Sequence, residues 1–344
     1  MIDKKLAIWC ILIFMSVTCG AVGQDARFNY DESQVPAYNL PDLLITDGGV
    51  VVDKSRQWER IRRPEVLELF TAHMFGRIPE NVVNDLRCEV VERGLAMEDR
   101  ARRLQVRIYF NSEKNGPAVG LLIYLPIDAN RRDTCPMFLG LNFMGNHTIT
   151  NDPLVHVTKS WVRNRDEIGY RNNQATSDAR GSSADRWPIR LLIESGFGVA
   201  TAYYGDIDPD FDDGFKNGVH AVYPKTDDSK GQEWGSIATW SWGLSRILDY
   251  LQTLESINPR QIGVIGHSRL GKTSLWAGAT DERFSLVISN DSGCGGAALS
   301  RRQFGETVQR INTSFPHWFC DKFQDYNANE SALPVDQHML IALI

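Results

Sequence analysis

The stretch Val264–Thr273, "VIGHSRLGKT", decides the fold because it fits two incompatible patterns. As G-x-x-x-x-G-K-T it is a P-loop, in which backbone N–H groups cradle phosphates, the lysine reaches the terminal phosphates and the threonine binds Mg²⁺. As a strand, a sharp turn with Ser268 at its tip and then a helix, it is a nucleophile elbow. The first pattern predicts a nucleotide-binding protein and the second predicts a serine esterase.

The surroundings of the motif favour the elbow. It follows several predicted strands, whereas a P-loop normally opens its domain, and an exported protein meets little ATP. In the P-loop alternative, Asp291 would be the carboxylate near Mg²⁺. Gly266 gives the elbow a small residue two positions before Ser268, but Leu270 breaks the usual G-x-S-x-G. A serine that only caps a helix therefore stays open as an alternative.

The first residues have the anatomy of a secretory signal. Two lysines precede an apolar run over residues 6–17, which is short for a membrane span, and small residues then lead to Gly23. We expect a signal peptide over 1–23 and one α/β-hydrolase catalytic domain over 24–344. The mature protein would be secreted or periplasmic and would carry no integral membrane segment.

Composition excludes several partners. The chain is 42% hydrophobic and 23% charged, as soluble globular proteins are, and its net charge of −6 is spread without long runs of one sign. Nucleic acid requires a clustered basic face, which the sequence lacks. We expect a monomer that acts on a neutral or small polar substrate.

The cysteines predict one disulfide and no metal site. A lipoprotein with Cys19 lipidated is an alternative, but Thr18 and Ser16 before it fit a lipobox poorly, and a retained N-terminal anchor is another alternative. After cleavage Cys88, Cys135, Cys294 and Cys320 remain, which allow three complete pairings. We expect a Cys294–Cys320 bond, since both follow the elbow. No zinc spacing and no histidine pair at helical spacing accompanies these cysteines, so no metal or cofactor is expected.

The order of patterns along the chain predicts the sheet. Three β-rich runs over 89–95, 103–110 and 118–126 are separated by turn residues and predict antiparallel strands. Two nearly continuous apolar runs over 135–143 and 196–206 are typical of strands buried on both faces of a parallel sheet.

Helical patterns alternate with the later strands. Residues 63–79 have helical spacing, with Pro64 near the start and Gly76 near the end. A long polar connection precedes a short helix over 187–195, and an amphipathic helix over 235–257 leads into the strand before Ser268. The alternation predicts an α/β-hydrolase fold with a mostly parallel central sheet and antiparallel N-terminal strands.

The flanks of the motif carry a family resemblance. "GHSRLGK", followed by "WAGATDERFSLVISNDSGCGGAALSRRQFGET", "INTSFPHWFC" and "PVDQHMLIALI", with "FLGLNFMGNHT" upstream, resembles the glucuronoyl esterases of carbohydrate esterase family fifteen. In that family the nucleophile motif is G-C/H-S-R-x-G-K, with the same displaced glycine. The resemblance covers most of the mature chain.

The resemblance implies a role for five residues. Ser268 is the nucleophile, and Arg269 stabilises the oxyanion with its N–H and its guanidinium. Lys272 and Glu306 bind the hydroxyls of the sugar. Asp291 lies where the acid of the catalytic triad is expected, although some relatives carry Glu there or use a carboxylate farther along the chain.

The catalytic histidine is the one component that the resemblance does not place in this chain. Relatives carry it beyond further C-terminal strands, so we expect those strands and the histidine to be missing and the chain as written to be impaired. His317 and His338 match positions that we interpret as structural.

The implied reaction is hydrolysis of 4-O-methyl-glucuronoyl esters between xylan and lignin alcohols, or of small glucuronate esters. An acetyl-xylan or other carbohydrate esterase, and an inactive carbohydrate-binding remnant, are the alternatives.

Overall fold

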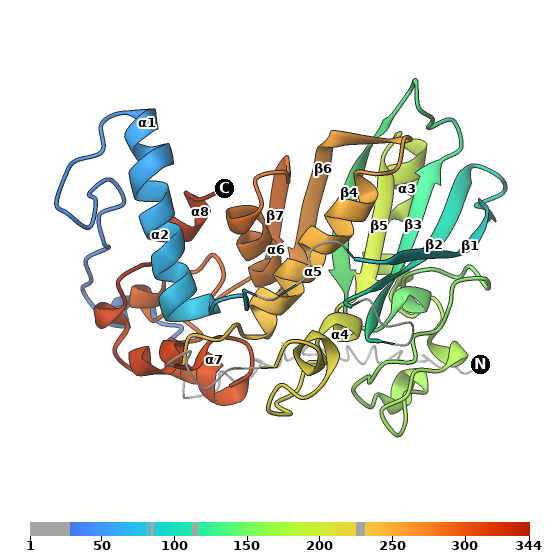
Figure 1. Ribbon diagram of the computed structural model, residues 1–344. Helices are drawn as coiled ribbons and strands as arrows, with labels where there is room; N and C mark the ends of the chain where they lie inside the picture. The colour runs from blue at the N-terminus through green and yellow to red at the C-terminus, as the bar shows by residue number, and fades with distance from the viewer. Residues whose placement is uncertain (1–27, 81, 83–85, 112–115, 225–230) are drawn as a thin grey trace, which may run out of the picture.

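Seven strands form one mixed sheet in the computed structural model, which describes residues 28–344 apart from 81, 83–85, 112–115 and 225–230. The predicted signal peptide lies outside the described residues. In chain order the strands are β1 (Cys88–Ala96), β2 (Ala101–Tyr109), β3 (Ala118–Pro126), β4 (Cys135–Asn142), β5 (Gly198–Tyr203), β6 (Ile257–His267) and β7 (Leu286–Asn290). Across the sheet they lie in the order β1-β2-β3-β5-β4-β6-β7 (Figure 1).

Strand directions confirm the predicted change along the chain. The pairs β1–β2, β2–β3 and β3–β5 are antiparallel. The pairs β4–β5, β4–β6 and β6–β7 are parallel, so the carboxyl ends of four strands meet at one edge of the sheet. Ligand and catalytic sites of α/β sheets form at this edge.

Helices cover both faces of the sheet. They are α1 (Ser55–Gln57), α2 (Arg63–Phe70), α3 (Ile189–Glu194), α4 (Tyr204–Ile207), α5 (Ser236–Leu251), α6 (Arg269–Thr280), α7 (Val308–Ser314) and α8 (Gln337–Ile341). The larger core contains side chains of α5 and α6, and a smaller core on the other face contains side chains of α3. Strand β3 contributes side chains to both cores, because Leu121 and Leu122 point to opposite faces of the sheet.

The first long helix begins earlier than predicted. Helical turns run without interruption from Ser55 to Phe75, with wide π-type turns over Trp58–Arg62 and Thr71–Phe75. The sequence predicted Pro64 at the start of the helix, but Pro64 lies within it. The wide turn before Pro64 accommodates the lack of a backbone N–H at this residue. Gly76 ends the helix as predicted, with φ of +87°.

Glycines explain why the elbow departs from the usual motif. A Cβ on Gly266 would lie 1.9 Å from the carbonyl oxygen of Leu270, so only glycine fits there. A Cβ on Gly271 would lie 3.0 Å from the carbonyl oxygen of Asn290, which makes this the close contact between α6 and the end of β7. Leu270 instead packs into the core. The second glycine of the motif therefore lies at position 271 instead of 270, because α6 approaches β7 through Gly271.

We expect Gly266→Ala to destabilise the fold. The added methyl meets backbone rather than a flexible side chain, so the free energy of unfolding should fall by about 1–3 kcal/mol or more, measured by urea denaturation. Gly263→Ala, in the same strand, is the control, because its methyl would meet the Leu286 side chain at 3.3 Å. An equal or smaller loss at Gly266 would contradict this account of the elbow.

Candidate active site

Ser268 occupies the strained tip of a turn between β6 and α6. Its φ of +55° and ψ of −127° are rare for a residue with a side chain. The Ser268 N–H donates to the carbonyl oxygen of Asn290 at 2.9 Å, which ties the turn to the end of β7. This is the geometry of a nucleophile elbow, as the sequence predicted.

The elbow borders a cleft of about 490 Å³ at the carboxyl edge of the parallel strands. Its walls are mostly aromatic and cationic. The aromatic side chains are Phe143, Tyr170, Trp187, Tyr203, Tyr204 and Phe315, and the cationic ones are Arg163, Arg165, Arg186 and Arg269. In a protein of net charge −6, this grouping of arginines suits a substrate that carries or develops negative charge.

Asp210 holds the side chain of Arg269, the residue next to Ser268. Its carboxylate accepts hydrogen bonds from Arg269, from Tyr204 at 2.9 Å, from the indole of Trp318 at 2.8 Å and from His317 at 3.0 Å. Asp210 is buried, whereas Arg269 is partly exposed at the cleft. The guanidinium is therefore fixed from behind by one carboxylate while its other side faces the cleft.

Electrostatics keep Asp210 ionised. Burial alone would raise the pKa of this carboxyl, but the hydrogen bond from His317 and the charge of Arg269 outweigh it, and its pKa lies well below its usual range. The Nε atom of Arg269 is buried with no hydrogen-bond partner among the described residues.

Lys272, Asp291 and Glu306 gather on another side of the elbow. Lys272 is only 3% exposed, and its Nζ donates to the carbonyl oxygen of Ser292 at 2.5 Å. Burial lowers the pKa of Lys272, while the charges of Glu306 and Asp291 oppose that shift. The lysine is thus directed toward protein rather than into an open phosphate cradle, which disfavours the P-loop alternative.

Asp291 directly follows β7 at the same edge of the sheet as Ser268. Residues His267 and Asn290 are register partners in the β6–β7 pair, so the next residue of each strand lies at the edge that carries the elbow. Asp291 is exposed and has φ of +49°. The structure therefore places Asp291 near the nucleophile turn, although it does not border the cleft described above.

The seven histidines offer Ser268 no evident base. Of these histidines only His267 borders the cleft, and its Nδ1 lies 3.1 Å from the side-chain nitrogen Nδ2 of Asn290. His317 is buried against Asp210, and Nε2 of His338 lies 3.0 Å from the carbonyl oxygen of Pro41. Both downstream histidines thus have structural partners.

The predicted Cys294–Cys320 disulfide is not formed. Cys294 is a buried free thiol, and burial raises its pKa to about 12. The ring of Phe319, next to Cys320, instead packs closely against Gly295, next to Cys294. Sequence proximity brought the two segments together without aligning the two sulfur atoms.

Over the described residues, no group of three or more His, Cys, Asp or Glu side chains could hold a metal ion. None of the helices in that part of the chain is both long and apolar enough to cross a bilayer.

Sequence reasoning missed Asp210, Tyr204 and the aromatic walls of the cleft. Asp210 lies in an acidic run, "DIDPDFDD", which resembles a solvated loop. The available signal was its place, since this run follows the buried strand β5 at its carboxyl end.

Comparisons with known proteins agree with this geometry. A sequence profile described as glucuronyl esterase, fungi, matches residues 213–344. Carbohydrate esterase MZ0003, from an unknown prokaryotic organism, is 51% identical over 97% of this chain and 78% of its own length.

Two solved structures are also similar. A promiscuous CE15 esterase from a marine bacterial metagenome is 52% identical, with a TM-score of 0.85 over 92% of this chain and 79% of that one. A glucuronoyl esterase from Solibacter usitatus is 40% identical, with a TM-score of 0.83 over 90% of this chain and 78% of that one. The family resemblance inferred from the sequence is thereby confirmed.

We expect Asp210→Asn to destabilise the protein by about 3–5 kcal/mol at neutral pH, because it leaves the Arg269 charge uncompensated. Since the folded-state pKa is depressed, the contribution of Asp210 is present above the ordinary aspartate pKa near 4 and is lost as pH falls through the folded value. Denaturation of both proteins should therefore show the difference shrinking in acid. Asp212→Asn, at an exposed position of the same loop, is the control; a loss independent of pH would contradict the ionic role.

Proposed function

We propose, since the chain belongs to the glucuronoyl esterases of carbohydrate esterase family 15, that it hydrolyses esters of 4-O-methyl-glucuronic acid between xylan and lignin alcohols. The proposal rests on the position of Ser268, which lies at a strained elbow on the border of the cleft. The next residue in the chain, Arg269, is a cation that Asp210 holds in place. A relative described as promiscuous makes an acetyl ester the natural comparison substrate.

Ser268 is the nucleophile in the proposed reaction. Its Oγ attacks the ester carbonyl, the C–O bond to the alcohol breaks, and the alcohol leaves with a proton. Water then attacks the glucuronoyl–serine ester, which releases glucuronate and restores the hydroxyl. The strained turn supports this role, because it presents the side chain at the edge of the sheet rather than in the core.

Arg269 stabilises the charge that develops on the carbonyl oxygen. Its N–H begins α6, and its partly exposed guanidinium borders the cleft. Preorganised donors of this kind can contribute roughly 3–4 kcal/mol to the transition state. Asp210 contributes indirectly, because it holds the guanidinium in place.

Asp291 is the proposed acid of the triad, and Lys272 and Glu306 are the proposed sugar anchors. The support is their shared neighbourhood, in which Lys272 feels the charges of both carboxylates. To bond a sugar hydroxyl, the Nζ of Lys272 would exchange its bond to the Ser292 carbonyl for one to the ligand. Glu306 is exposed and needs no such exchange.

None of the seven histidines is assigned as the general base. His317 already bonds Asp210 through Nε2, and its Nδ1 is buried without a partner among the described residues. A base that is not present in this sequence can be replaced by a small molecule, so imidazole in solution tests this assignment directly.

Export and a monomeric state complete the proposal. The predicted signal over 1–23 would carry the protein to the secreted or periplasmic compartment in which plant polysaccharide esters are met.

We expect imidazole to accelerate hydrolysis of the benzyl ester of D-glucuronic acid by the 344-residue chain. Ser268→Ala should reduce the imidazole-dependent rate by about a thousandfold or more, because the nucleophile is lost. Release of benzyl alcohol measures the rate, an acetyl ester of xylose serves as the comparison substrate, and Ser331→Ala, at an exposed position, is the control.

Three outcomes would overturn parts of the proposal. Turnover that survives Ser268→Ala excludes the nucleophile, and faster turnover of the acetyl ester excludes the substrate. Full activity without imidazole that is lost in His317→Ala would assign the base to His317.

A further inference from the structure

A second cavity, of about 740 Å³, lies on the antiparallel part of the sheet. Strand β3 forms its floor with Ala118 and Gly120, and Arg107 of β2 is the register partner of Gly120. Because glycine has no side chain, the Asp206 carboxylate from α4 reaches the space in front of β3. Gly120 N–H donates to Asp206 at 3.0 Å. A volume of this size is typical of small-molecule sites.

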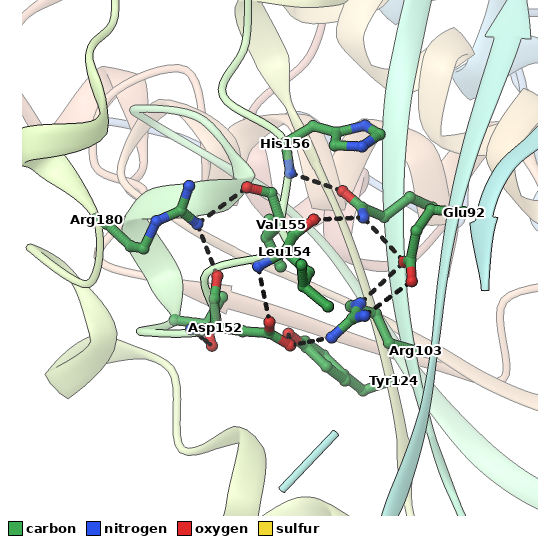
Figure 2. A network of polar contacts seen from close by, with 10 residues as sticks. Glu92, Arg103, Tyr124, Asp152, Leu154, Val155, His156 and Arg180 are labelled. Atoms are coloured by element: carbon green, nitrogen blue, oxygen red, sulfur yellow. Dashed lines mark hydrogen bonds and ion pairs between the residues drawn. The ribbon is translucent and has the colours of Figure 1, made fainter. Parts of the chain in front are cut away.

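One wall of this cavity is a segment of the long connection between β4 and β5, and it is fixed in place. Arg103 bonds Glu92 of β1 and Asp152 of the connection, and Gln105 bonds the backbone of Leu154 and His156 (Figure 2). Farther along, the hydroxyl of Thr158 donates to Asp206 at 2.8 Å. The wall is thus pinned to the sheet at both ends, so the cavity is preformed.

The charges in the cavity are divided between rim and floor. Arg107 and Lys159 are exposed lining residues, and neither has an ion-pair partner among the described side chains. The floor carries Asp206, which accepts hydrogen bonds from Gly120 and Thr158 and also has the Ser160 side chain as a hydrogen-bond partner. A carboxylate has about four acceptor sites, so one is left for a further donor. A carboxylate on the floor repels a phosphate but accepts from a hydroxyl, and the cationic rim attracts a carboxylate.

The cavity also adjoins the catalytic cleft. Tyr203 lines both, and Asn146 of the cavity accepts a hydrogen bond at 2.7 Å from Asn142 of the cleft. The two spaces are therefore separated by little more than one layer of side chains. A polymer that occupies the cleft has its neighbouring units close to the cavity.

We propose that this cavity is a second carbohydrate site that binds an unesterified uronate unit, with the sugar carboxylate at Arg107 and Lys159 and a hydroxyl donating to Asp206. The choice of an acidic polysaccharide as ligand rests on the proposed function, but the site itself is independent of Ser268. The uronate can come from glucuronoxylan or from a galacturonan, which share this chemistry.

Calorimetry on the Ser268→Ala protein tests the proposal without turnover. The probes are a xylo-oligosaccharide that carries one free glucuronic acid, a galacturonate oligosaccharide and a neutral xylo-oligosaccharide of equal length. We expect both acidic probes to bind about tenfold more tightly than the neutral one, and rising salt to weaken only the acidic probes. The tighter of the two acidic probes identifies the source.

The variant Arg107→Gln with Lys159→Gln should weaken acidic binding about tenfold and leave the thermal melt unchanged, because both side chains are exposed. Lys54→Gln with Arg132→Gln removes the same charge elsewhere and is the matched control. In the Ser268-containing chain, the first double variant should leave hydrolysis of the small benzyl ester unchanged.

The second site would be overturned if the Arg107/Lys159 variant and its control bound the acidic probes with equal affinity. It would also be overturned if the neutral probe bound as tightly as the acidic ones. Failure of benzyl ester hydrolysis in the presence of imidazole, with intact binding of the acidic probes, would instead overturn the proposed function alone. Perturbation of the Gly120 and Thr158 amide resonances by the acidic probe assigns the binding to this cavity, and perturbation confined to the cleft would contradict it.

Discussion

The strained backbone of Ser268 is the constraint on which the rest of the site depends. A residue at φ of +55° costs of order 1–3 kcal/mol, so it persists only where its surroundings permit no other geometry. Gly266 lets Leu270 approach, Gly271 lets α6 approach β7, and the bond to Asn290 closes the turn. Packing of β6, α6 and β7 therefore determines the position of Ser268.

A second constraint follows from the charge next to Ser268. In the proposed reaction Arg269 can act as the oxyanion donor only if its guanidinium is prevented from reaching into solvent. Asp210 prevents this. Its buried partners Tyr204, Trp318 and His317 orient the carboxylate, and His317, Arg269 and Trp318 keep it ionised. The position of Arg269 thus depends on a carboxylate that follows β5, which is separated from β6 by β4 in the sheet.

Local patterns predicted the strands, the change from antiparallel to parallel pairing and the elbow, because each has its own periodicity or turn chemistry. They did not predict Asp210, since its role arises from Arg269, His317 and Trp318, which lie 59 to 108 residues away in sequence. They also did not predict the wide turns that carry the first helix past Pro64. The Cys294–Cys320 bond was wrong for the same reason: proximity of two segments does not fix the geometry of two side chains.

The most direct test of the central claim is to label the protein with an activated fluorophosphonate, in the presence of imidazole as the general base, and to locate the adduct by peptide mass spectrometry. The account predicts one adduct, on the peptide that contains Ser268, and its absence in Ser268→Ala. An adduct on a different serine, or equal labelling of both proteins, would show that the elbow does not present the nucleophile.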